Sequence, residues 1–148
     1  MFLTTNKQAH HNYEITDTFE AGMVLSGPEV KSIKKGQMDL KGAYASVDAN
    51  SEVWLVNAYI ASYKPARLAQ KNYNPNQPRK LLLTKKEIRF LIGKQKEKGF
   101  SIIPLEVYLK NSFIKIKIGI GRGKKKYDKR EALKKRDFER KKQRLVAI

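Results

Sequence analysis

The chain of 148 residues contains no cysteine and only two histidines, and these absences exclude whole classes of site. Without cysteine there is no disulfide and no thiolate-bound metal or cluster. No apolar run approaches the roughly 18 residues that a membrane-spanning helix requires, so no membrane partner is expected. Residues 1–13 lack the pattern of a signal peptide. We therefore expect a cytoplasmic protein.

Acidic residues are also scarce, since 14 Asp and Glu stand against 32 Lys and Arg, for a net charge of +18. Half of that charge lies in residues 122–148, where 13 Lys or Arg accompany four acids for a net +9. The apolar residues of this segment are too few and too badly spaced to form a core-facing helical stripe. We expect the segment to be disordered when free and to fold on a polyanion, which we take to be RNA. A membrane surface fits less well, because the segment lacks the aromatic and leucine face of an interfacial helix.

The rest of the chain, residues 1–123, has the apolar periodicity of one mainly β domain with helices. Strands are expected where β-branched and aromatic residues gather, at residues 13–15, 22–25, 43–47, 53–60, 102–108 and 113–118. The first two flank a Thr16-Asp17 turn, and the others form two hairpins. The strict alternation from Ile114 to Ile118 predicts one buried face and one basic face.

Two helices are expected between these strands. The first opens at Gly27-Pro28 and stops at Gly36, and the second is capped by Thr84 with Glu87 and stops at Gly99. A long exposed loop is expected at residues 62–80. Five or six strands with two or three helices predict an oligonucleotide-binding-fold-like closed β-barrel.

The alternating glycines Gly119, Gly121 and Gly123 precede a lysine and invite comparison with a phosphate-binding loop. The Walker spacing would require a glycine at position 118, where the chain has Ile118, and no helix with an apolar face follows. We therefore interpret the glycines as a flexible hinge that ends regular structure.

No catalytic or metal motif emerges from the sequence. His10 and His11 are adjacent, and adjacent side chains rarely converge on one metal. There is no Gly-x-Ser-x-Gly elbow and no histidine spacing that defines a triad. Two alternatives stay open: a ribosomal or other generic RNA-binding protein, and a metal-dependent RNA-processing enzyme that would cleave RNA when Mg²⁺ is added.

Glu29, in the first turn of the first expected helix and among lysines, has two possible roles. It can cap the helix, or it can accept hydrogen bonds from base amino groups on an RNA-binding surface. Trp54 and Tyr59 are expected in the core. Tyr127 and Phe138 are expected to stack on RNA bases, at about 1–3 kcal/mol each.

Several blocks of the sequence resemble the small protein B family, the SsrA-binding proteins that partner transfer-messenger RNA (tmRNA) in bacterial trans-translation. The blocks run in order from residue 6 to residue 137 without large gaps. They are Asn6-Lys7-Gln8-Ala9 with His11 and Tyr13, Phe19-Glu20-Ala21-Gly22, Gly27-Pro28-Glu29-Val30-Lys31-Ser32, Leu40-Lys41 with Tyr44, Arg79-Lys80-Leu81-Leu82-Leu83, Leu91-Ile92-Gly93-Lys94, Gly123-Lys124-Lys125, Tyr127-Asp128-Lys129-Arg130 and Arg136-Asp137. The chain departs from the family pattern at His10, Tyr127 and Phe138, and the two aromatic departures keep a planar ring.

The resemblance implies an RNA-binding protein of the oligonucleotide-binding fold, without cofactor or enzymatic activity and monomeric when free. Residues 1–123 would clamp the tRNA-like domain of tmRNA, and residues 124–148 would become helical in the mRNA channel of a stalled ribosome, in place of codon–anticodon pairing. The implied tmRNA contacts are Asn6, Lys7, His11, Tyr13, Glu29, Lys31, Ser32, Arg79, Lys80, Leu81 and Lys94. The implied contacts at the small-subunit decoding site are Gly123, Lys124, Lys125, Tyr127, Asp128, Lys129, Arg130, Arg136 and Phe138.

Overall fold

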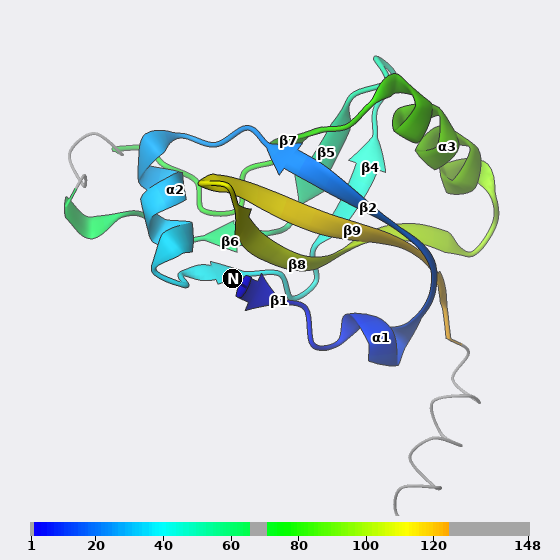
Figure 1. Ribbon diagram of the computed structural model, residues 1–148, viewed down its shortest axis with the longest axis horizontal. Coiled ribbons are helices and arrows are strands. Elements are labelled where there is room, and N and C mark those ends of the chain that lie inside the picture. The colour runs from blue at the N-terminus through cyan, green and yellow to red at the C-terminus, as the bar shows by residue number, and fades with distance from the viewer. Residues whose placement is uncertain (1, 66–70, 125–148) are drawn as a thin grey trace, which may run out of the picture.

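A computed structural model describes residues 2–65 and 71–124, and within these ranges the chain forms nine strands and three helices (Figure 1). In chain order they are β1 (Phe2–Thr5), α1 (Ala9–Asn12), β2 (Tyr13–Met23), α2 (Gly27–Lys34), β3 (Met38–Asp39), β4 (Tyr44–Val47), β5 (Val53–Val56), β6 (Tyr59–Ile60), β7 (Arg79–Leu82), α3 (Lys85–Lys96), β8 (Phe100–Lys110) and β9 (Phe113–Gly123).

The main sheet closes on itself. Its strands follow the order β1, β8, β4, β5, β7, β2, β9, and β9 also pairs with β8. The strands from β8 round to β9 therefore form a ring, and β1 extends one edge of the long strand β8. Strands β3 and β6 form a separate small sheet. Helix α2 packs against β6 at one end of the ring, and α3 packs against β4 and β8 at the other (Figure 1). The predicted class, mainly β with flanking helices and a sheet that closes, is confirmed.

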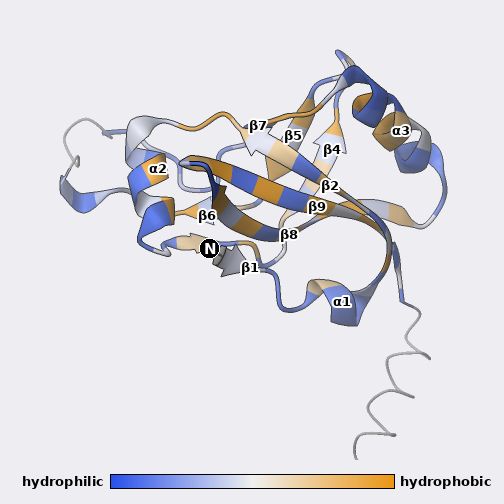
Figure 2. Ribbon diagram, in the orientation of Figure 1, coloured by the Kyte–Doolittle hydropathy of each residue, from blue (hydrophilic) through white to orange (hydrophobic). Residues whose placement is uncertain are grey.

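The interior of the ring is filled by alternate residues of its strands. In β9, Ile116, Ile118 and Ile120 are 0% exposed, while Lys115 and Lys117, which alternate with Ile114, Ile116 and Ile118, are only half-buried. Figure 2 shows this alternation as orange and blue bands along β9. Each buried isoleucine stabilises the fold by about 1.5–3 kcal/mol relative to an exposed one. The predicted division into a buried and a basic face is confirmed.

The two short strands expected at residues 13–15 and 22–25 are one strand, β2. The polar Thr16-Asp17 pair is not a turn but a bulge, since Ile15 pairs with Gly121 and Asp17 with the next residue of β9, Ile120. The Thr16 hydroxyl donates to the Ile120 carbonyl at 3.3 Å, and β2 stays paired with β9 on both sides of the bulge. A bulge of this kind keeps the strand and increases its local twist.

The interpretation of the glycines as a flexible hinge was wrong, because β9 continues through Gly119 and Gly121 to Gly123. A Cβ atom on Gly121 would lie 2.9 Å from Ile15 Cδ1 and 3.0 Å from Tyr13 Cβ. A Cβ atom on Gly119 would lie 3.0 Å from Leu105 Cδ1. Glycine is required here because side chains of β2 and β8 pack directly onto the backbone of β9.

The remaining differences are at strand and helix ends. The strand expected at residues 53–60 breaks at Asn57, whose φ is 62°, and its last part, β6, pairs with β3 instead. Tyr59 is 44% exposed, so its expected core position was wrong. Trp54 is half-buried, and its indole N–H donates to Asp48 at 2.9 Å. The capping box of Thr84 and Glu87 is confirmed.

Candidate RNA interface

The residues expected to contact tmRNA fall into two groups on the ring. The first group lies near a pocket between the N-terminal segment and α3. The others belong to α2 and β7, which the fold brings together although they are about fifty residues apart in the chain. The two groups are Asn6, Lys7, His11, Tyr13 and Lys94, and Glu29, Lys31, Ser32, Arg79, Lys80 and Leu81.

The contact between α2 and β7 is a buried ion pair. Arg79 Nη2 lies 2.7 Å from Glu29 Oε2, and Arg79 Nε donates to the same oxygen at 2.8 Å. Arg79 also donates to the Ala58 carbonyl at 2.7 Å. The other carboxylate oxygen of Glu29 accepts the Ser26 backbone N–H at 3.1 Å and so completes a capping box at the start of α2.

Tyr73 joins this pair from the loop before β7. Its hydroxyl oxygen accepts a hydrogen bond from Arg79 Nη2 at 2.8 Å. The hydroxyl can donate to the Ile60 carbonyl, at 2.9 Å, or to Glu29 Oε2, at 3.1 Å. Burial raises the pKa of Tyr73 to about 12. Burial alone would raise the pKa of Glu29, but the Ser26 N–H and the Arg79 guanidinium outweigh it and hold that pKa below its ordinary value.

Four of the residues expected to contact RNA are buried in the chain without RNA. Glu29, Arg79 and Leu81 are 2–3% exposed and Ser32 is 0% exposed, so their side chains face the protein interior. The carboxylate of Glu29 is engaged by Ser26, Tyr73 and Arg79 in the free chain, so its expected role as an acceptor for base amino groups stays a prediction. Its alternative role as a helix cap is the one the structure shows. A first-turn acid cannot reveal a partner fifty residues away, which is why the sequence left both roles open.

Two lysines of this group remain at the surface. Lys31 is exposed on α2, where its ammonium group lies 5.4 Å from the centre of the Tyr63 ring, and Lys35 lies 4.9 Å from the same ring. Lys80 is half-buried on β7 and lies 3.4 Å from Glu52. These side chains give α2 and β7 a positively charged surface outside the buried Glu29–Arg79 pair.

The Arg79–Leu83 block also contains an exposed leucine. Leu82 of β7 pairs with Gly22 of β2 and is 53% exposed, as is Val24. A Cβ atom on Gly22 would lie 3.4 Å from Leu82 Cβ and 3.6 Å from Lys115 Nζ. We call this surface, formed by Gly22, Val24, Lys80, Leu82 and Lys115, the Leu82 face. The signal was in the sequence: Leu81 and Leu82 are adjacent in a strand, so only one of them can face the core.

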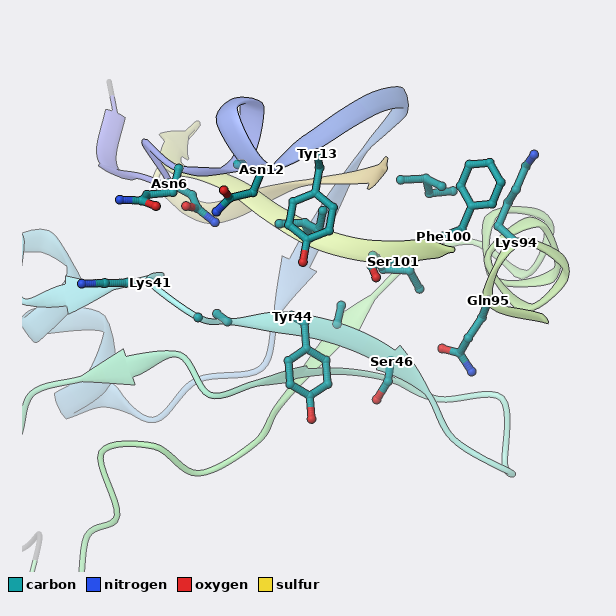
Figure 3. Close-up of a pocket in the computed structure, with 18 residues that line it drawn as sticks. Asn6, Asn12, Tyr13, Lys41, Tyr44, Ser46, Lys94, Gln95, Phe100 and Ser101 are labelled. Atoms are coloured by element: carbon teal, nitrogen blue, oxygen red, sulfur yellow. The ribbon is translucent and has the colours of Figure 1, made fainter. Parts of the chain in front are cut away.

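Three residues of the first group, Asn6, Tyr13 and Lys94, line the pocket, which has a volume of about 590 Å³ (Figure 3). Asn6 anchors the N-terminal segment to β8, with its side-chain amide donating to the Pro104 carbonyl at 3.0 Å and its backbone N–H donating to Leu105 at 2.8 Å. Tyr13 is half-buried in the pocket wall, and Lys94 lies 4.8 Å from the centre of the Phe100 ring. Lys7 is exposed beside α1, and His11 is half-buried on it.

The C-terminal segment leaves the ring beside the same helix. The Lys124 backbone N–H donates to the Asn12 carbonyl at 2.9 Å, and its ammonium group donates to the His10 carbonyl at 2.9 Å. The Gly123 N–H points to the Gly99 carbonyl at 3.4 Å. The remaining positions expected at the decoding site lie outside the described residues: Lys125, Tyr127, Asp128, Lys129, Arg130, Arg136 and Phe138.

The described residues, 2–65 and 71–124, offer neither a metal-binding cluster nor a membrane-spanning helix. Among these residues no three His, Asp or Glu side chains gather in a way that could hold a metal ion. None of the described helices has the length and apolar character needed to cross a membrane.

Comparisons with known proteins identify the family of this chain. The model of the family described as "SmpB protein" matches residues 3–148. The SsrA-binding protein of Shouchella clausii is 50% identical over 141 residues, covering 95% of this chain and 88% of the relative, and that of Persephonella marina is 52% identical over 138 residues, covering 93% and 89%. A solved structure described as "tmRNA-SmpB: a journey to the center of the bacterial ribosome" contains a chain with 40% identity and a TM-score of 0.69, covering 88% of this chain and 93% of that one.

Proposed function

The chain belongs to the SmpB protein family, and we propose from this that it binds the tRNA-like domain of tmRNA and delivers it to stalled bacterial ribosomes for trans-translation. Its relatives are named SsrA-binding proteins, and the related solved chain is described with tmRNA and the bacterial ribosome. The role is one of binding and delivery rather than of catalysis, and we place it in the cytoplasm, where ribosomes work. The observation that carries the proposal is the family match from residue 3 to residue 148, which includes both the ring and the basic C-terminal segment.

We propose that the ring, residues 1–123, carries the tmRNA contacts on its exposed side chains. The Leu82 face, which includes Lys80, lies where β7 pairs with β2, and its lysines and its apolar side chains would contact phosphates and an unstacked base. Lys31 adds an exposed cation on α2. Lys7, His11, Tyr13 and Lys94 offer a second basic surface near α1. In this proposal the buried residues Glu29, Ser32, Arg79 and Leu81 act indirectly, because they hold α2 and β7 in place.

We propose that residues 124–148 act at the decoding site and mRNA channel of the small subunit. The support is the charge of this segment and the fixed point at which it leaves the ring, where Lys124 is hydrogen-bonded to the carbonyls of α1. The residues that would then contact small-subunit rRNA are Gly123, Lys124, Lys125, Tyr127, Asp128, Lys129, Arg130, Arg136 and Phe138.

The experiment that tests the proposal compares two RNAs. The full chain is titrated with the tRNA-like domain of tmRNA and with an unrelated structured RNA of equal length, at several salt concentrations. Non-specific phosphate binding weakens steeply as salt rises for both RNAs. We expect the tRNA-like domain to bind at least tenfold more tightly at every salt concentration. Equal affinity for the two RNAs would instead indicate a generic RNA-binding protein.

A further inference from the structure

The pocket beside α1 lies over the weakest junction of the ring. Strands β4 and β8 share a single ladder pair, Ala45 with Ile102. Beyond that pair the side-chain amide of Gln95 takes the place of a strand, accepting the Val47 N–H at 2.9 Å and donating to the Val47 carbonyl at 3.2 Å. The hollow exists because β4 carries small side chains where it borders this junction, among them Ala45 and Ser46.

The floor of the pocket is apolar, and a lysine lies at each end; Lys94, one of the two, also lies 3.6 Å from Glu97. Ile102, Ile103 and Ile120 belong to its lining. In Figure 3, Lys41 lies at one end of the pocket and Lys94, beside Phe100, at the other. None of the 18 lining residues is Asp or Glu, as far as the described part of the chain extends. An anionic ligand with a flat apolar body matches this distribution of charge, whereas a lone phosphate would leave the apolar floor unused.

Several polar groups in the wall are free to recognise such a ligand. Within residues 2–65 and 71–124, no hydrogen bond engages the side chains of Asn12, Tyr13 or Ser101. Asn6 and Gln95 differ, because their amides are engaged by the carbonyl of Pro104 and by Val47. A free amide can donate and accept at the edge of a base, and the ring of Tyr13 offers a surface on which a base can stack. The Phe100 ring is already contacted by Lys94 and Arg122, each 4.8 Å from its centre.

We propose that this pocket holds one nucleobase, unstacked from the RNA that the protein binds, with Lys41 and Lys94 placed to contact the phosphates on either side of it. The inference rests on the proposed function, since it assumes an RNA ligand. A volume of about 590 Å³ falls in the range of about 300–1,000 Å³ that is usual for small-molecule sites and accommodates one nucleotide.

The first test uses mononucleotides as probes. The full chain, labelled with ¹⁵N, is titrated with the 5′-monophosphates of adenosine, guanosine, cytidine and uridine, and with ribose 5-phosphate as the base-free control. We expect at least one nucleotide to cause saturable shifts at the Asn12 amide and at backbone amides of β4 and β8, and ribose 5-phosphate to cause none there. Equal shifts with ribose 5-phosphate would reduce the pocket to a phosphate contact and overturn the proposal, as would no response to all four nucleotides.

The second test fills the pocket. Ser101 lies at its rim and is exposed, so Ser101→Trp occupies the space without a change of charge, and Ser62→Trp, at an exposed position elsewhere, is the matched control. We expect Ser101→Trp to lower nucleotide affinity at least tenfold and Ser62→Trp to leave it unchanged. If Ser101→Trp does not fold, Asn12→Leu, which removes only the free amide, should lower the affinity severalfold. Unchanged affinity in a folded pocket variant would refute the assignment.

Binding of the wild-type chain to the tRNA-like domain is measured in parallel. If the wild type shows no preference for that RNA, the proposed function fails. If it shows the preference while the nucleotides leave the pocket residues unshifted, only the nucleobase site fails.

Discussion

The guanidinium of Arg79 lies 2.7 Å from the carboxylate of Glu29, and both side chains are almost completely buried. The pair joins the first residue of β7 to the first turn of α2. Two charges removed from water are stable only with good geometry and further hydrogen bonds, which Ser26, Ala58 and Tyr73 supply. The position of α2 on the ring therefore depends on this contact.

Glu29→Ala should destabilise the fold strongly, because it leaves the Arg79 charge buried without its partner. We expect a loss of about 3–5 kcal/mol in the free energy of unfolding, measured by urea denaturation. Glu52→Ala is the matched control, since it removes an acid from an exposed pair with Lys80 and should cost at most about 1 kcal/mol. If both variants lose the same small amount, the buried pair does not hold α2 in place.

The same pair should make stability fall in acid. The pKa of Glu29 in the folded chain lies below its ordinary value of 4.5, so the unfolded chain binds the proton more readily. The contribution of Glu29 is complete above about pH 4.5 and is lost as pH falls through the lowered pKa. Glu29→Gln, measured by denaturation between pH 3 and pH 7, should therefore show a weaker dependence on pH than the wild type. Parallel curves for the two proteins would contradict this.

Gly121→Ala should destabilise the protein although it adds only a methyl group. The new Cβ would meet Ile15 Cδ1 at 2.9 Å and the Glu14 carbonyl oxygen at 3.2 Å, and relieving that overlap should cost about 1–3 kcal/mol. Gly93→Ala in α3 is the control, because nothing lies within 4 Å of its Cβ and alanine favours a helix by about 0.5–1 kcal/mol. Relative to the wild type, the midpoint temperature of thermal unfolding should fall for Gly121→Ala and rise for Gly93→Ala. A tolerated Gly121→Ala would restore the interpretation of a flexible hinge.

Two neighbouring leucines should separate stability from binding. Leu81 is 2% exposed, and Leu81→Ala should cost about 2–5 kcal/mol in stability. Leu82 is 53% exposed, and Leu82→Ala should change stability by at most about 0.5 kcal/mol while weakening binding to the tRNA-like domain of tmRNA by about tenfold. Calorimetry and RNA titration of the two variants test this. Wild-type RNA affinity in Leu82→Ala would remove the Leu82 face from the proposed interface.

The C-terminal segment should be separable from the ring at Lys124. A chain truncated after Lys124 keeps the hydrogen bonds to His10 and Asn12, and we expect its thermal stability and its affinity for the tRNA-like domain to stay near those of the full chain. Peptide transfer to tmRNA on stalled ribosomes should be lost. In the full chain, Tyr127→Ala should lower that transfer and Tyr127→His should preserve it, because a planar ring can still stack on a base. Normal transfer by the truncated chain would refute a role at the decoding site.

Local patterns predicted the parts of the fold that depend on neighbouring residues. The alternation from Ile114 to Ile118 identified the central strand and its basic face, and Thr84 with Glu87 identified the start of α3. Both signals work because the strand period and the capping box are properties of a few consecutive residues.

The errors arose where a residue depends on a distant partner. Gly121 has the same local pattern whether it lies in a free loop or beneath Ile15, more than a hundred residues earlier in the chain. Glu29 likewise gives no local sign that Arg79 will meet it in the interior. For the proposed interface, the sequence indicated blocks on α2 and β7 but not which alternate side chains of β7 face outward.

The double pairing of β9 with β2 and β8 determines when during synthesis the protein can fold. β2 is complete at Met23, yet its long-range partner begins only at Phe113. Contacts between residues so far apart in sequence form slowly, because the loop-closure entropy must be overcome before they stabilise the chain. While β9 is still inside the ribosome, the edges of β2 and β8 that will pair with β9 have unpaired backbone groups. These edges are then accessible to chaperones and to other strands. Ring closure, and with it any RNA-binding surface that spans β2 and β9, must follow the translation of residue 123.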